Sequence, residues 1–110
     1  MQLKDYQKKA KKTALYPKEY KIIYPALGLG NEAGEVLGKI KKWLRGDSGK
    51  KNITKEQRED IKGELGDALW YIAVLADDIN ISLDDVAKYN LEKLASRNKR
   101  GVLKGNGDNR

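Results

Sequence analysis

Apolar residues recur along the chain at the three- and four-residue spacing of amphipathic helices, and no stretch shows the two-residue alternation of a strand. The pattern predicts four helices: one from Leu3 to near Tyr16, one from Ala26 to about Leu44, one from Thr54 to Asn80, and one from Ser82 to roughly Arg97. The first should end before Pro17, because proline disfavours helical backbone in the residue that precedes it. We therefore expect an all-α fold resembling a four-helix bundle.

Local signals refine these boundaries. Thr54 with Gln57 three residues later is a capping-box signature, and Ser82 with Asp85 is a second candidate N-terminal cap. Residues 45–53 have the glycine-rich polar composition of a surface loop. The second helix contains four glycines, which lower helix stability and therefore predict close packing or the close approach of a ligand: Gly28, Gly30, Gly34 and Gly38.

The 110 residues are enough for one core, so we expect residues 1–110 to form a single domain. Within it, residues 1–25 make a basic N-terminal helix and a connector stopped by Pro25, and residues 98–110 make an irregular glycine-rich tail. No apolar run is long enough for a membrane span. The first residues are rich in lysine and lack the apolar segment that a signal peptide requires. We therefore expect a cytoplasmic protein without a membrane partner.

Composition narrows the possible chemistry further. The chain has no cysteine and no histidine, which excludes disulfides, thiolate zinc sites and the commonest general base. Lys and Arg number 23 against 16 Asp and Glu, so the net charge of +7 favours anionic partners. Any catalysis must use carboxylates, lysines and hydroxyls.

Two pairs of acids occupy equivalent positions on neighbouring predicted helices. Glu32 and Glu35 lie on the second helix, and Glu64 and Asp67 lie on the third. An α-helix turns by about 100° per residue. Measured around the helix axis from the centre of the apolar stripe, the first acid of each pair lies at about 80° and the second at about 140°, in the same direction of rotation on both helices. If the two helices run antiparallel, all four carboxylates should meet at one edge of their interface.

Four converging carboxylates require either protonation or a cation. Mg²⁺ suits a site with only hard oxygen ligands, and Mn²⁺ could replace it. The alternative is that acids three residues apart in a lysine-rich helix are simply solvated charge, which is common.

The sequence around these acids resembles the MazG-like, all-α nucleoside triphosphate pyrophosphohydrolases. The matching text runs Leu27-Gly-Leu-Gly-Asn-Glu-Ala-Gly-Glu35 for the first pair and Gly63-Glu-Leu-Gly-Asp-Ala-Leu-Trp-Tyr71 for the second. Asn90, Lys93 and Arg97 follow on the fourth helix, with a glycine-rich segment after them.

The resemblance implies magnesium-dependent hydrolysis of a nucleoside triphosphate to the monophosphate and pyrophosphate. It implies that the four acids bind metal, that Glu32 or Glu35 accepts the proton of the attacking water, and that Asn90, Lys93 and Arg97 contact the substrate. Three further residues are weaker candidates for phosphate or base contacts and have ordinary structural explanations: Lys39, Trp43 and Trp70.

Other interpretations remain open from the sequence. The basic composition also fits a small helical nucleic-acid-binding protein, although acids at a helix interface would repel a polynucleotide. A catalytically silent helical oligomerisation module is a third possibility. A bundle this short buries only about two thirds of its unfolded surface, which favours association, and the resemblance also implies a homodimer or homotetramer.

Overall fold

A computed structural model describes residues 1–46, 49 and 52–110. It contains four α-helices, α1 (Leu3–Lys11), α2 (Ile23–Arg45), α3 (Lys55–Asp78) and α4 (Leu83–Lys99), with a short 3₁₀ helix, η1 (Lys18–Tyr20). The described residues form no strand, so the predicted all-α class is confirmed. None of these helices combines the length and apolar character needed to cross a bilayer.

Both predicted N-terminal caps are present. The Thr54 hydroxyl accepts a hydrogen bond from the Gln57 backbone at 3.1 Å, and the Gln57 side chain accepts one from the Thr54 backbone at 3.0 Å. The Ser82 hydroxyl accepts from the Asp85 backbone at 3.0 Å and starts α4. These bonds satisfy backbone donors that lack partners in the first helical turn, so the sequence alone places both helix starts.

Two other predicted boundaries are wrong. The helix α2 begins at Ile23 instead of Ala26, because Pro25 lies in its first turn, where the missing backbone N–H has no helical partner to lose. The helix α1 ends at Lys11, and the Thr13 hydroxyl donates to the Ala10 carbonyl at 2.7 Å, a local bond that competes with continued helix. The predicted loop 45–53 includes residues 47–48 and 50–51, which lie outside the described residues.

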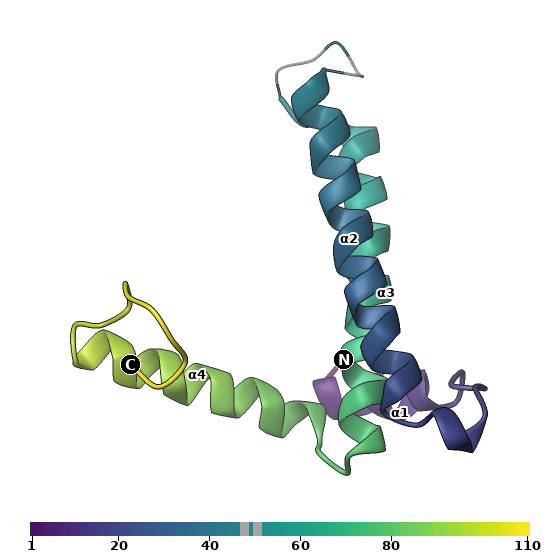
Figure 1. The fold of residues 1–110 in the computed structure, drawn as a ribbon, viewed down its shortest axis with the longest axis vertical. Helices are drawn as coiled ribbons and strands as arrows, with labels where there is room; N and C mark the ends of the chain where they lie inside the picture. Colours follow the sequence, from purple (N-terminus) through teal and green to yellow (C-terminus); the bar gives the residue numbers. More distant parts are fainter. Residues whose placement is uncertain (47–48, 50–51) are drawn as a thin grey trace.

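The helices α2 and α3 run side by side as a long antiparallel hairpin (Figure 1). The helix α1 crosses the base of this hairpin, and α4 leaves the base in a different direction, which gives the molecule the outline of an L. The radius of gyration is 16.9 Å, whereas a compact chain of this length has about 13 Å. One chain is therefore far more open than a closed bundle.

The buried core is small and lies at the base of the hairpin. Ala10, Ala73, Val74 and Leu83 form its centre, with partly buried aromatic side chains around them. Buried Gln7 fixes α1 to this junction: its amide nitrogen donates to the carbonyls of Ala73 and Ile81 at 3.1 and 3.0 Å. Its amide oxygen accepts from the Leu83 backbone at 3.0 Å, so Gln7 joins α1, α3 and the start of α4.

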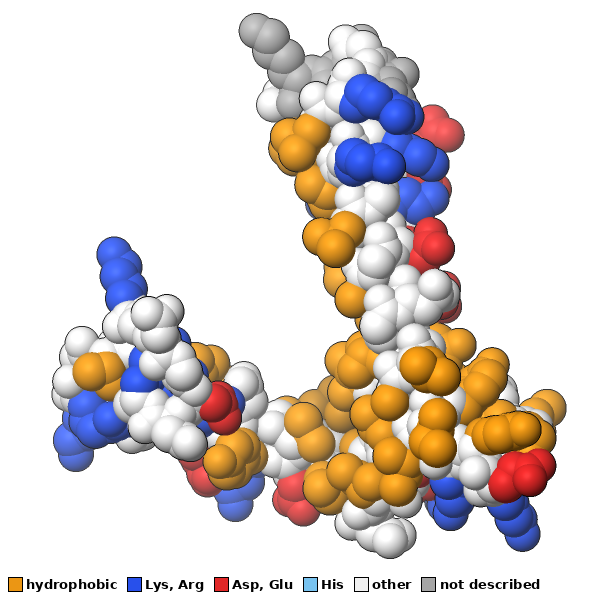
Figure 2. All heavy atoms as spheres, viewed as in Figure 1, with side chains coloured by type: hydrophobic (Ala, Val, Ile, Leu, Met, Phe, Trp, Pro, Cys, Tyr) orange, Lys and Arg blue, Asp and Glu red, His pale blue; other side chains and the backbone are white. Residues whose placement is uncertain are grey.

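Much of the remaining apolar surface is uncovered. Leu27, Leu37 and Leu44 on α2 are 70–75% exposed, and Leu65 on α3 is 55% exposed. Figure 2 shows hydrophobic side chains along the edge of the hairpin that faces the concave side of the L, whereas acidic and basic side chains lie together on the opposite edge. Such a continuous apolar face is unusual for an isolated soluble chain.

A glycine sets how α2 and α3 meet. A Cβ atom on Gly28 would overlap the Tyr71 ring, so only glycine allows this contact. The Tyr71 ring is held between neighbours, with the Trp70 ring 4.9 Å away edge-on and the Tyr24 ring 6.3 Å away. Of the four glycines in α2, Gly28 is therefore explained by close packing.

We expect Gly28→Ala to destabilise the protein by about 1–3 kcal/mol, the usual cost of overpacking an interface. Gly30→Ala is the matched control, because its Cβ would meet nothing within 4 Å and alanine favours helix by about 1 kcal/mol. Urea denaturation followed by circular dichroism compares the two variants. Equal stability would contradict the packing role of Gly28.

Candidate metal centre

The contact between Gly28 and Tyr71 also determines which acids face each other. Glu32 follows Gly28 by four residues, and Asp67 precedes Tyr71 by four residues, so each pair lies on one face of its helix. In an antiparallel hairpin, the register that places Gly28 opposite Tyr71 therefore also places Glu32 opposite Asp67. The site lies near the middle of both helices, where rigid backbone supports it.

Three of the four predicted carboxylates come together. Glu32, Glu64 and Asp67 each offer an oxygen within 4.8 Å of the others. Glu32 and Glu64 are half-buried, whereas Asp67 is exposed, so the group opens to solvent on one side. Glu35 is exposed and lies outside this group, although its negative charge still acts on Glu32.

Electrostatic repulsion within the group acts on the pKa of Glu32. Partial burial raises the pKa of Glu32 above its ordinary 4.5, and protonated Glu32 donates a hydrogen bond to Glu64, which raises the pKa further. The charges of Asp67, Glu64 and Glu35 act in the same direction. Either protonation of Glu32 or a bound cation would offset part of the negative charge, and a divalent cation would offset more of it.

The donor set fits a hard divalent ion. The three side chains supply only oxygen ligands from two rigid helices, and the chain contains no cysteine or histidine to favour a softer metal. Three carboxylates leave several of the six positions of octahedral Mg²⁺ to other oxygen ligands such as phosphate. The group could therefore hold a metal ion that also binds a phosphorylated ligand.

Tyrosines border the acidic group, and the sequence interpretation overlooked them. Burial raises the pKa of Tyr71, assisted by a hydrogen bond with Tyr24 and by the charges of Glu32 and Asp67. Burial also raises the pKa of Tyr6 on α1, with a contribution from Asp67. The position of Tyr71 one turn after Asp67 is the sequence signal that could have identified it.

The weaker candidates lie in different surroundings. Trp70 belongs to the base of the hairpin, where its indole nitrogen donates to the Thr13 hydroxyl at 2.7 Å. Lys39 and Trp43 are half-buried on α2, about two and three turns beyond Glu32 toward the far end of the hairpin. None of the three belongs to the carboxylate group.

The candidate substrate-binding residues lie on α4, which points away from the hairpin (Figure 1). Asn90 is exposed on this helix. Lys93 and Arg97 both contact Asp108 of the C-terminal segment, at 2.6 and 3.1 Å. The structure therefore groups the two cations with each other and separates them from the carboxylates of the same chain.

The raised pKa of Glu32 leads to a pH-dependent stability prediction. Because the folded-state pKa lies above 4.5, ionising Glu32 lowers stability as the pH rises through that window. In EDTA at pH 7, Glu32→Gln should melt at a higher temperature than the wild type, and the gain should disappear below pH 4.5.

Thermal melts at pH 4 and pH 7 test this expectation. Glu59→Gln is the control, because the contact of Glu59 within the described part of the chain is an exposed ion pair with Lys62 at 2.6 Å on the same helix. A lower melting temperature for Glu32→Gln than for the wild type at pH 7 would contradict the repulsion.

Known proteins give an independent view of the same residues. The family model of the MazG nucleotide pyrophosphohydrolase domain matches residues 25–102, a range that contains the carboxylates and α4. The Gene 37 protein of Mycobacterium phage L5 is 45% identical over 111 residues, with 96% of each chain covered. The uncharacterized protein YvdC of Bacillus subtilis (strain 168) is 35% identical over 104 residues, which cover 88% of this chain and 96% of that protein. No solved structure matches. The chain belongs to the MazG nucleotide pyrophosphohydrolase domain family.

Proposed function

We propose that the protein is a Mg²⁺-dependent pyrophosphohydrolase that converts a nucleoside or deoxynucleoside triphosphate and water to the monophosphate and pyrophosphate. The observation that carries the proposal is the meeting of Glu32, Glu64 and Asp67 in the middle of the hairpin, inside the range matched by the family model. Phosphoryl transfer needs mainly positioning and charge compensation, which a chain without cysteine or histidine can supply.

The carboxylates have two tasks in this proposal. Glu32, Glu64 and Asp67 would hold the metal ion, and Mn²⁺ would substitute for Mg²⁺ because both accept oxygen ligands. When bound, the ion would offset phosphate charge and polarise the reacting phosphoryl group. Glu35 lies beside this group with its carboxylate outside it, so it is available to accept the proton of the attacking water.

The polar face of α4 provides the substrate contacts. Asn90, Lys93 and Arg97 follow one another at spacings of three and four residues and thus share one side of the helix. Lys93 and Arg97 bind the outer phosphates, and Asn90 binds a phosphate or the sugar. Lys39 is a secondary phosphate contact, and Trp43 or Trp70 stacks on the base.

The working enzyme is a homo-oligomer, at least a dimer, in which α4 of one subunit approaches the carboxylates of its partner. Two features support this arrangement: α4 points away from the hairpin of its own chain (Figure 1), and Leu27, Leu37, Leu44 and Leu65 of the hairpin are exposed. Association with further copies would cover the apolar edge of the hairpin and would bring the cations of another subunit to the acids on the opposite edge. A homotetramer would be a pair of such dimers.

The proposed activity predicts pyrophosphate release from a panel of nucleoside triphosphates in Mg²⁺ and none in EDTA. We expect Asp67→Asn and Glu35→Gln to lower kcat by at least about 100-fold, the usual scale for a lost catalytic group. Magnesium should raise the melting temperatures of the wild type and of Glu35→Gln. The increase should be smaller for Asp67→Asn.

Glu59→Gln on α3 is the control and should remain active, because it removes an exposed acid outside the group. Full turnover by both Asp67→Asn and Glu35→Gln would contradict a catalytic role for the carboxylates.

The shared site predicts a mass of at least twice the 12.4 kDa of one chain in light scattering.

The shared site also predicts that two inactive variants, Asp67→Asn and Lys93→Ala, regain activity when they are unfolded together and refolded. A random mixture should recover up to about a quarter of wild-type activity, because half of the dimers are mixed and each has one intact site. A monomer, or no recovery in mixed dimers, would contradict a site built from two subunits.

A further inference from the structure

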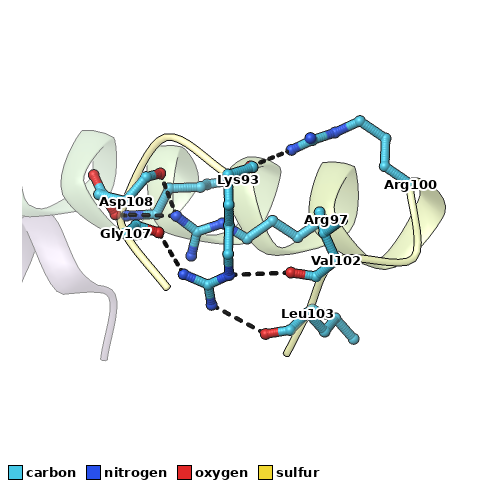
Figure 3. Close-up of polar contacts among 8 residues, drawn as sticks. Lys93, Arg97, Arg100, Val102, Leu103, Gly107 and Asp108 are labelled. Atoms are coloured by element: carbon cyan, nitrogen blue, oxygen red, sulfur yellow. Dashed lines mark hydrogen bonds and ion pairs between the residues drawn. The ribbon is translucent and has the colours of Figure 1, made fainter. Parts of the chain in front are cut away.

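The last ten residues, which the sequence presents as an irregular tail, fold back as an ordered loop against the end of α4 (Figure 3). The loop reverses direction at glycines with positive φ, including Gly105 at 153° and Gly107 at 83°. A Cβ on Gly105 would lie 2.9 Å from Cδ of Arg110, so the loop closes tightly on that side chain. The segment after α4, residues 101–110, is called the C-terminal loop below.

Arg110 holds the C-terminal loop together from inside. Its guanidinium donates to the carbonyls of Val102 and Leu103, each at 3.0 Å, and to the carbonyl of Gly107. Its own carbonyl accepts a hydrogen bond from Arg100 at 2.8 Å, which ties the end of the chain to the end of α4. Several bonds must break together before the loop can open, so it is a braced element of the structure.

The braced loop places Asp108 between Lys93 and Arg97 of α4. One Asp108 carboxylate oxygen lies 2.6 Å from Lys93 Nζ and 3.1 Å from an Arg97 nitrogen, and the Asp108 carbonyl accepts from the same Arg97 nitrogen. The hydrogen bonds from Lys93 and Arg97 lower the pKa of Asp108, so it stays ionised near neutral pH. Figure 3 shows both cationic side chains directed at Asp108.

This contact leaves binding capacity unused. One carboxylate offsets only one of two positive charges, and the Lys93 ammonium uses one of its three donors on Asp108. Arg97 is 95% buried, since only 5% is exposed. Within the described part of the chain, its Nε is the one buried side-chain donor without a hydrogen-bond partner. A buried donor without an acceptor is costly, which points to an acceptor from a ligand.

We propose that Asp108 is a positioning residue that holds Lys93 and Arg97 ready for phosphate binding, and that Arg110 keeps Asp108 in place. This inference rests on the proposed function and adds a role for the C-terminal loop. Lysine and arginine have flexible side chains, and fixing them before the ligand arrives removes part of the entropic cost of binding. The remaining positive charge then attracts a second anion beside Asp108.

The opposite role would be competition, in which Asp108 occupies the place of a phosphate and must leave before substrate binds. The bracing by Arg110 and the burial of Arg97 favour positioning, because release of Asp108 would require the whole loop to open. The two roles predict opposite changes: loss of Asp108 weakens phosphate binding if it positions the cations and strengthens it if it competes.

The test compares Asp108→Asn and Arg110→Ala with the wild type in the full-length protein. If Asp108 positions the cations, both variants should raise KM for the triphosphate about tenfold, with a much smaller change in kcat. Both should weaken the binding of inorganic pyrophosphate, measured by calorimetry, by a similar factor. Asp108→Glu, which retains the charge, should recover part of the affinity.

Glu92→Gln is the matched control, because Glu92 is an exposed acid next to Lys93 and forms no hydrogen bond or ion pair among the described residues. Melting temperatures of all variants separate a binding defect from unfolding. Unchanged or tighter pyrophosphate binding by Asp108→Asn would overturn the inference. A wild type that releases no pyrophosphate from any nucleotide would instead overturn the proposed function, while the calorimetric comparison would still test Asp108.

Discussion

The close contact between Gly28 and the Tyr71 ring fixes how the two long helices of the hairpin lie against each other. Because both helices are rigid and antiparallel, one register determines every pair of residues along their interface. Glu32 meets Glu64 and Asp67 one turn away from that contact. The glycine that seemed a local weakness of α2 is therefore what brings its backbone close enough for the acids to share a site.

The carboxylates of Glu32, Glu64 and Asp67 repel one another, and a bound cation would reduce this repulsion. Glu32 has a raised pKa and shares a hydrogen bond with Glu64, as expected for neighbouring carboxylates that cannot all ionise freely. A hard cation bound there would offset the repulsion and would stabilise the folded hairpin. Under the proposed function, folding stability and metal affinity would therefore be linked through the same three side chains.

The two arms of the open chain carry groups of opposite charge. The carboxylates lie in the hairpin, whereas Lys93 and Arg97 lie on a helix that points away from it (Figure 1). Exposed leucines follow the hairpin, and a braced loop orders the cations on α4. The carboxylates and the Lys93–Arg97 pair are each organised within one chain, and under the proposed function the association of chains would bring them together.

Features that depend on local spacing could be predicted from the amino-acid sequence. Helical periodicity predicted four helices, the capping motifs of Thr54 and Ser82 located two helix starts, and the matched offsets of the acids predicted their convergence. Features that depend on contacts between residues distant along the chain emerged from the folded structure alone. It left Glu35 outside the closest group, added Tyr71 beside it, directed α4 away from the hairpin and folded the glycine-rich tail onto Arg97. The physical reason is that spacing defines the face of a helix, whereas register, crossing direction and loop closure follow from packing between helices.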